Sequence, residues 1–172
     1  MFTKIDLCSM ALLKLGEKPI QSLQEDSSAA QLSRTLFDSV VDTLLSSFPW
    51  RFATQKLTLN KNSDGDFVVP VDVLRILKCD GQITGNKITA NADILEIIAI
   101  VKTEPECFPS YFASLIATKL AQEFCVPLTG DATVFKMITA LYESEYQSAK
   151  FIDSTISNPT QINNFSLINS RF

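Results

Sequence analysis

The fold is decided at Phe48-Pro49-Trp50-Arg51-Phe52-Ala53, because the spacing of apolar residues changes within this short segment. Before it, apolar side chains recur every three or four positions, which is the period of a helix with one buried face. Pro49 ends that pattern, since proline lacks the amide hydrogen that a continuing helix needs. After Trp50, apolar and polar residues alternate with the two-residue period of a strand as far as Leu59. The segment therefore predicts a helix over residues 28–48 that leads directly into a sheet.

A shorter helix is expected over residues 3–15, upstream of the long one. Thr3 can cap its first turn, and Asp6 stands three positions later, where its carboxylate can bond back to the cap. Gly16 supplies the left-handed conformation in which many helices end. The pair Lys18-Pro19 then imposes an extended step, because the residue before proline avoids the helical region.

The region from about residue 52 to residue 101 carries the strand pattern. Short runs rich in β-branched residues are separated by turn-forming clusters of Asp, Asn, Ser and Gly. The turns are expected at Asn62-Ser63-Asp64-Gly65, Asp80-Gly81, Gly85-Asn86 and Asn91-Ala92-Asp93. This pattern predicts one small antiparallel sheet inserted between helical segments.

Helical spacing returns after the stiff segment Glu104-Pro105-Glu106-Cys107-Phe108-Pro109. Helices are predicted over residues 110–124 and 131–152, with a break at Pro127-Leu128-Thr129-Gly130 and a cap at Asp131. The predicted fold class is therefore α+β and mainly helical, with a four-helix body and an inserted small antiparallel β-sheet.

Residues 153–172 are expected to lie outside the single domain of residues 1–152. They are rich in Ser, Asn and Thr and lose helical spacing, yet they keep four spaced apolar residues: Phe165, Leu167, Ile168 and Phe172. One interpretation is a disordered terminus, which is common in globular proteins. The other, which we favour, is an extended C-terminal arm that uses these side chains as anchors on a partner subunit.

Composition limits the chemistry that this chain can perform. None of the 172 residues is His, so Ser-His-Asp and Cys-His sites are excluded and the commonest transition-metal ligand is absent. Cys8, Cys79, Cys107 and Cys125 form no C-x-x-C pair, and we interpret them as reduced thiols that serve as small core residues. The sequence predicts neither a metal site nor a cofactor.

Carboxylate pairs are the remaining candidates for acid–base chemistry. Glu104/Glu106 and Glu143/Glu145 could act in this way, but residues two apart on a helix do not share a face. We interpret both pairs as solvated surface charge. Asp64-x-Asp66 is a turn sequence that does not continue into a calcium loop. An enzyme is therefore not expected.

Net charge and hydropathy argue against two further classes of partner. The formal charge of −4 and the isoelectric point near 4.8 disfavour tight binding to nucleic acid. The apolar run from Ile94 to Val101 is too short to span a bilayer, and the N-terminus lacks the pattern of a signal peptide. We expect a protein that stays in the cytoplasm where it is made and has no membrane partner.

Trp50, the only tryptophan, has two possible roles. It can pack in the core where the long helix passes into the sheet, or it can be an interface hot spot, since Trp and Arg dominate such sites. Its apolar neighbours Phe48 and Phe52 favour the core.

A series of short motifs occurs in a fixed order along the chain. They are Leu12-Leu13-Lys14-Leu15-Gly16-Glu17-Lys18-Pro19-Ile20 with Ser22-Leu23, Trp50-x-Phe52-Ala53 with Leu57, Phe67-Val68-Val69-Pro70-x-Asp72-Val73-Leu74-Arg75, Phe108-Pro109-x-Tyr111-Phe112, and Leu120-Ala121 before Pro127. In this order the sequence resembles the head-to-tail adaptors of tailed phages, called tail accessory factors or tail tubular protein A in short-tailed phages. The resemblance covers most of the chain, from about Ile5 to Ile152. Helical head-completion proteins of long-tailed phages are a more distant possibility, and the inserted sheet favours the short-tailed relatives.

The resemblance implies a structural virion protein without catalysis. Its partners would be the portal protein, under which it would form a dodecameric ring of identical subunits, and the tail nozzle or next tail component. The ring would extend the DNA channel, through which DNA passes without specific binding, and would give the tail a docking platform. Such a protein is assembled in the host cytoplasm and ends in the neck of the virion.

The alternative hypothesis is a small cytosolic enzyme or regulatory domain whose site the sequence does not reveal. Assembly into rings on a portal separates the two hypotheses, because an enzyme needs no such partner.

Overall fold

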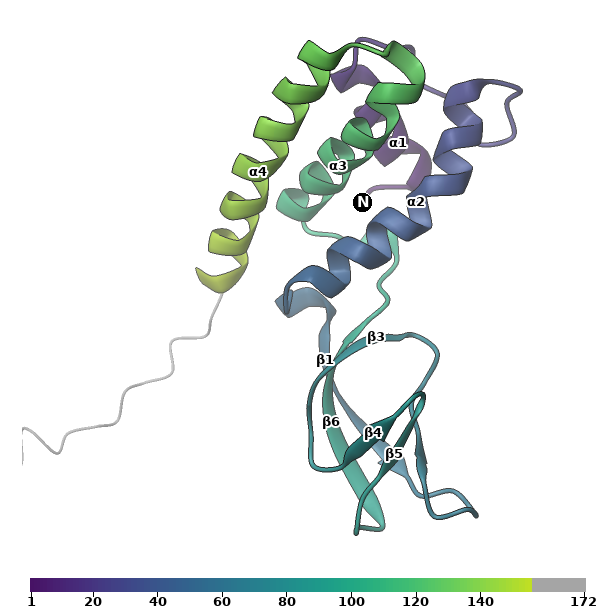
Figure 1. Cartoon of the computed structure of the whole chain (residues 1–172), viewed down its shortest axis with the longest axis vertical. Coiled ribbons are helices and arrows are strands. Elements are labelled where there is room, and N and C mark those ends of the chain that lie inside the picture. The colour runs from purple at the N-terminus through teal and green to yellow at the C-terminus, as the bar shows by residue number, and fades with distance from the viewer. Residues whose placement is uncertain (156–172) are drawn as a thin grey trace, which may run out of the picture.

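The computed structural model describes residues 1–155 and has the α+β architecture that the sequence predicts. Four helices form one end of the molecule and the β-strands form the other, as Figure 1 shows. All of the described strands lie between the second and third helices in the chain. The helices are α1 (Lys4–Lys14), α2 (Ser28–Ser47), α3 (Ser110–Thr129) and α4 (Ala132–Thr155).

The two N-terminal helices begin at hydroxyl residues that cap them. In α1, the Thr3 hydroxyl accepts the Asp6 N–H, and the Asp6 carboxylate accepts the Thr3 N–H at 2.8 Å, which completes the predicted capping box. Gly16, with a φ of 77°, follows the helix as predicted. α2 begins after Ser27, whose hydroxyl accepts the N–H of Ala30.

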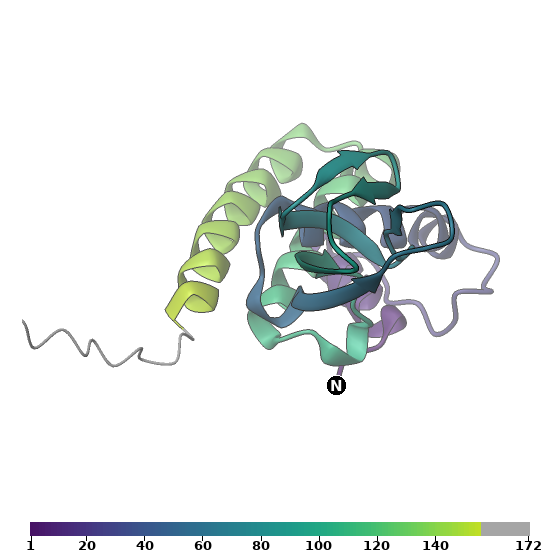
Figure 2. The ribbon, with the colours of Figure 1, turned by 90° about the horizontal axis from the view of Figure 1, so that it is seen from below.

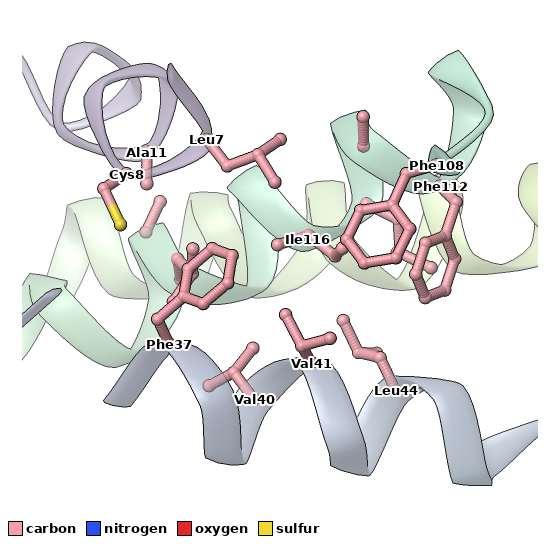
Figure 3. Packing of buried hydrophobic residues seen from close by; sticks show 14 of the residues in the cluster. Leu7, Cys8, Ala11, Phe37, Val40, Val41, Leu44, Phe108, Phe112 and Ile116 are labelled. Atoms are coloured by element: carbon pink, nitrogen blue, oxygen red, sulfur yellow. The ribbon is translucent and has the colours of Figure 1, made fainter. Parts of the chain in front are cut away.

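α3 is the centre of the helical body, because α1, α2 and α4 all pack against it. In Figure 3, Leu7 of α1 and Val41 of α2 point from opposite sides toward Ile116 of α3. All three side chains are buried. Full burial of an aliphatic side chain stabilises the fold by about 1.5–3 kcal/mol, so this three-helix contact is a large part of the driving force.

The third helix is longer than predicted. The spacing predicts an end at residue 124 and a break from Pro127 onward, but α3 continues to Thr129 and ends at Gly130, which has a φ of 62°. The Gly130 N–H donates to the Cys125 carbonyl at 3.2 Å, and the Thr129 hydroxyl donates to the same carbonyl at 2.7 Å. The proline costs one helical hydrogen bond, and these cap bonds hold the last turn in place.

The insertion holds two three-stranded antiparallel sheets, so the prediction of a single sheet is wrong. The longer strands form a sheet of order β1-β6-β3, and the shorter ones form a sheet of order β2-β5-β4. A 3-10 turn, η1 (Arg51–Ala53), comes first, so the strand pattern starts later than the predicted residue 52. The strands are β1 (Thr54–Asn60), β2 (Phe67–Val68), β3 (Val73–Cys79), β4 (Gln82–Thr84), β5 (Lys87–Thr89) and β6 (Ile94–Val101).

The two sheets share a small apolar core of their own. Phe67 of β2 and Ile88 of β5 are fully buried against one face of the longer sheet. Because Phe67 and Ile88 are buried in this shared core, the short strands fold over the long sheet instead of extending it. Within the shorter sheet, Gly81 allows the chain before β4 to lie close to β5, because a Cβ there would lie 2.7 Å from the Ile88 side chain and 2.9 Å from the Thr89 carbonyl oxygen.

Strand β3 connects this core to the helical one. Its pairing with β6 contains two register shifts, which change the usual alternation of side chains between the two faces of a strand. Leu74 and Leu77 pack against the helical core, whereas Val73 and Ile76 pack against the core of the insertion.

The domain also extends further than predicted at its C-terminal end. The sequence pattern predicts that the last helix ends at residue 152 and that the arm begins at Asp153, but α4 continues to Thr155 and Asp153 is buried in it. Asp131 caps α4 as predicted. The four arm residues, Phe165, Leu167, Ile168 and Phe172, lie outside the described residues, so the arm stays a prediction.

Candidate functional site

The helices and the insertion meet at a cluster of aromatic rings around Trp50. The ring centroids of Phe48 and Phe112 each lie 5.0 Å from that of Trp50 in edge-on geometry. Phe52 lies 4.8 Å from Phe112, and Phe108 lies 5.2 Å from it on the side shown in Figure 3. Edge-on pairs add about 0.5–1.5 kcal/mol each beyond burial. Trp50 is 0% exposed, so the prediction that it is a core residue is confirmed.

The indole nitrogen of Trp50 fixes this cluster to the end of α2. Its Nε1 donates to the Leu44 carbonyl at 2.8 Å. Carbonyls in the last turn of a helix lack amide partners, and the Leu44 carbonyl is satisfied by the indole together with the Ser47 hydroxyl, which donates to it at 2.7 Å. On the other side of the indole, the Tyr146 ring lies 6.2 Å away and its hydroxyl bonds to the Ser47 hydroxyl at 3.1 Å. The second half of α4 is thereby joined to the same junction.

Asp153 lies beside the aromatic cluster and joins three segments that are far apart in sequence. Its two carboxylate oxygens accept the Arg51 N–H at 3.1 and 3.2 Å, and one of them accepts the Tyr111 hydroxyl at 2.6 Å. Arg51 begins the passage into the insertion, Tyr111 lies in the first turn of α3, and Asp153 lies in the last turn of α4. We call these three groups the Asp153 clasp.

The chemistry of the Asp153 clasp suits a structural contact. Asp153 is 1% exposed, and a buried carboxylate is costly unless donors surround it. Burial raises the pKa of the Tyr111 hydroxyl above its usual 10.0, and the hydrogen bond to Asp153 raises it further. The hydroxyl is therefore protonated at neutral pH and donates, so the clasp holds the starts of α3 and of the insertion against the end of α4.

A second carboxylate, Glu145, fixes α4 to two other helices. It accepts the hydroxyls of Thr118 and Ser114 on α3 and the ammonium group of Lys14 at the end of α1, the last at 3.4 Å. The interpretation of Glu143/Glu145 as solvated charge is therefore wrong for Glu145, because its position on α4 faces α3. It holds for Glu143, which is exposed.

The other acidic candidates lie at the surface. Glu104 and Glu106 are exposed around the short turn η2 (Pro105–Cys107), as expected for solvated charge. Asp64 is exposed in its turn, while Asp66 bonds to Lys87 across two strands at 3.5 Å. Within residues 1–155, no group of three or more acidic or cysteine side chains is gathered that could hold a metal ion. No helix in the same range has the length and apolarity to cross a membrane.

The cysteines do not all serve as core residues. Cys8 and Cys125 are buried, as the sequence predicts, and burial raises the pKa of the Cys8 thiol. Cys79 is half-buried and Cys107 is exposed, so the interpretation is wrong for Cys107. All four are free thiols.

The insertion carries an exposed groove of about 480 Å³ between its two sheets. Val71, whose side chain is fully exposed, lies on one wall, and Ile83 of β4 and Ile76 of β3 line it too. Arg75 is the only charged residue among those that line it. A shallow lining that mixes aliphatic side chains with polar groups suits the docking of a protein segment better than the binding of a charged small molecule.

No protein-family model and no curated protein matches this chain. The arrangement of its own residues is thus what bears on function.

Sequence reasoning located the aromatic junction but missed the two carboxylates. A signal was present for Asp153, which follows Tyr146 and Ala149 at helical spacing and so stands on the apolar side of α4. A charge in that position indicates a buried polar partner. The partners themselves, Arg51 and Tyr111, could not be found from spacing, because they lie on other segments.

Proposed function

We propose that this protein is a head-to-tail adaptor of a short-tailed phage, a structural virion protein that forms a ring under the portal. The ring extends the DNA channel and provides the docking platform for the tail nozzle or next tail component. In this proposal the protein is not an enzyme and takes no cofactor, and DNA passes through without specific binding. Assembly takes place in the host cytoplasm and the product is located in the virion.

The observation that carries the proposal is the convergence of the adaptor-like motifs on one junction. Phe52, from the motif that follows α2, lies 6.2 Å from Phe108 and 4.8 Å from Phe112, which belong to the motif that opens α3. Arg51 and Tyr111, from the same two motifs, bond to Asp153. The motifs on which the resemblance rests thus lie where the insertion joins the body. This position gives their spacing a structural reason that involves no catalysis.

The separation of the molecule into two ends also supports the proposal. Figure 1 shows the helical body at one end and the insertion at the other. A subunit of this shape offers one end to a portal and the other to a tail. The exposed groove at Val71 gives the insertion a partly apolar surface for the next tail component.

The positions of the buried carboxylates favour a structural role over the enzyme alternative. Asp153 and Glu145 each accept hydrogen bonds from at least two other segments of the chain. A catalytic base needs access to substrate and a pKa near the working pH. Carboxylates engaged in this way stabilise an arrangement of helices instead.

The proposal includes a C-terminal arm over residues 156–172, with Phe165, Leu167, Ile168 and Phe172 as anchors on the portal or on a neighbouring adaptor. Two side chains just before the arm support this placement. Phe151 is 70% exposed and Ile152 is 41% exposed, so an apolar surface leads up to the first arm residue.

The proposal is tested by electron microscopy of the purified protein mixed with the portal protein encoded in the same genome. We expect a ring of adaptor density on one end of the portal with the rotational symmetry of the portal. If the portal carries no added density at micromolar adaptor concentration, the proposal is refuted and the alternative of an enzyme or regulatory domain is favoured.

The arm is tested separately by truncation after Thr155, which spares the Asp153 clasp. The truncated protein should keep its melting temperature, since the arm is not part of the described core, while its attachment to portal weakens. A matched control is the full chain with Ser157 and Ser166 changed to Ala, which keeps the four anchors. Unchanged attachment after truncation would show that the arm has no role in docking.

A further inference from the structure

One flank of α4, next to the side that packs on α3, is exposed, and its members carry no charge. We call it the α4 outer face, and its members, by helical spacing, are Met137, Leu141, Ser144, Ser148, Phe151 and Ile152. Met137 and Phe151 are 68% and 70% exposed. Figure 2 shows α4 standing at the edge of the molecule, apart from the strands. Four exposed large apolar side chains on one flank, with two small serines between them, are typical of an interaction surface.

A groove runs between α2 and α3 on a different side of the body. Two adjoining hollows of about 410 and 250 Å³ share Leu36 and extend along α2. We call them the α2–α3 groove, lined by Gln31, Leu32, Thr35, Leu36, Ser39 and Pro127 among others. The α2 wall of this groove is uncharged and consists of aliphatic and small polar side chains.

We propose that the α4 outer face of one copy packs into the α2–α3 groove of the next copy, an inference that rests on the proposed ring. The two surfaces match in length. At 1.5 Å per residue, the outer face from Met137 to Ile152 and the groove from Ser28 to Thr43 are each about 22 Å long. One is a convex helix face and the other is concave.

The charges around both surfaces select this pairing. Lys119 and Glu123 border the hollow of about 250 Å³ and form an ion pair with each other at 2.7 Å. An apolar helix face would therefore meet paired charges there. On α4, Lys136, Glu143 and Lys150 lie outside the outer face by helical spacing. Packing by any other exposed face of α4 would require these charges to lose water.

The geometry of the pairing leads to a ring. α3 lies between α4 and α2 in the body, so the outer face and the groove are on different sides of one subunit (Figure 1). Contact between two different surfaces is head-to-tail, and repeated head-to-tail contact closes into a ring when the rotation between copies permits. The inference thus names the subunit interface of the proposed adaptor ring.

The test uses two exposed positions, one on each surface: Met137→Glu on the outer face and Thr35→Glu in the groove. Sedimentation velocity of the full chain from 1 to about 200 µM should show concentration-dependent association for the wild type. Each variant alone should raise the apparent Kd at least tenfold. Ser154→Glu, on α4 but outside the outer face, is the matched control and should associate like the wild type. Equal melting temperatures show that all variants are folded.

Mixing the two variants gives the decisive result. A head-to-tail contact needs one intact surface from each partner, so the mixture should form heterodimers and nothing longer. Absence of heterodimers, or association of either variant at the wild-type concentration, would overturn the inference, as would a wild type that stays monomeric throughout. Association that follows this pattern without attachment to portal would leave the inference standing and refute the proposed function. If both variants form rings on the portal as well as the wild type does, the proposed function stands and the inference about the interface is refuted.

Discussion

The helical body and the β insertion are stabilised by cores of different size and kind. In the body, α3, with ten of its 20 residues buried, is covered by the three other helices, and the apolar cluster continues without interruption to Trp50. In the insertion, two small sheets close over Phe67 and Ile88, and the fit depends on the missing side chain of Gly81. The body buries many more apolar side chains than the insertion, so most of the hydrophobic stabilisation comes from the helical core.

The comparison shows that the insertion depends on its attachment to the body. Small sheets bury little apolar surface and are marginal alone. Here Leu74 and Leu77 of β3, together with Ile100 of β6, extend into the helical core. The insertion is therefore stabilised by its contacts with the helical core near the junction around Trp50.

The largest effect is expected from Trp50→Ala, which removes the side chain that both regions contact. We expect a loss of about 3–5 kcal/mol in the free energy of unfolding, as for other buried aromatic residues. The Leu44 carbonyl also loses its indole donor. Urea denaturation followed by circular dichroism measures the change. A small change in stability accompanied by failure of ring assembly would instead make Trp50 an interface residue.

Gly81→Ala tests the insertion without touching the body. The added Cβ would lie 2.9 Å from the Thr89 carbonyl oxygen, which is backbone and cannot easily move. Overpacking of this kind costs about 1–3 kcal/mol. Hydrogen exchange should show lower protection in β4 and β5 and unchanged protection in α3. Thr84→Ala, which shortens an exposed side chain of β4 and adds no new contact, is the control and should leave protection in β5 nearly unchanged. Equal loss of protection in α3 would show that the two regions unfold as one unit.

How far the sequence predicts this structure differs between the same two regions. The helices α1 and α2, with their caps, and the strand segments followed from local spacing, because period and capping are local properties. The division into two sheets did not, since it is decided by which strands pair across the chain. The end of α3 was missed because cap bonds to Cys125 outweigh one proline.

The candidate site shows the same limit. Trp50 was recognised from its apolar neighbours, which are adjacent in sequence. Asp153 was assigned to the arm, because the polar composition after it concealed its helical spacing from Ala149. Its role depends on donors from η1 and α3, and long-range contacts of that kind are not encoded in a local pattern.

Asp153→Ala is expected to have an intermediate effect, because it removes a contact between the regions without opening either core. It leaves the Arg51 N–H and the Tyr111 hydroxyl without their acceptor, and unsatisfied buried donors cost about 1–3 kcal/mol. Chemical denaturation measures the loss. Tyr111→Phe removes one donor, so the double variant should lose less than the sum of the two single changes. Strict additivity would show that the two groups do not interact.

The smallest effect is expected from pH at the helix caps of the body. The backbone N–H groups of Thr133 and Val134, at 2.7 and 3.2 Å, hold the pKa of the Asp131 carboxyl below its usual 3.8. A carboxyl with a lowered folded-state pKa stabilises the fold fully above the unfolded value and loses that contribution as pH falls through the folded one. The wild type should therefore lose stability below about pH 4, and protonation of Asp131 should account for part of that loss.

Asp131→Asn isolates that part, since Asn caps a helix without a charge. We expect the variant to melt slightly below the wild type at pH 7, where the wild-type carboxylate also interacts with the N-terminal helix dipole, and to converge with it near pH 2. Melting followed at 222 nm between pH 2 and 7 measures the difference. Asp6 of α1, whose pKa is lowered by its backbone hydrogen bond with Thr3, should behave alike when changed to Asn. Curves that stay parallel over the whole range would show that cap ionisation contributes nothing to the acid sensitivity of the helical body.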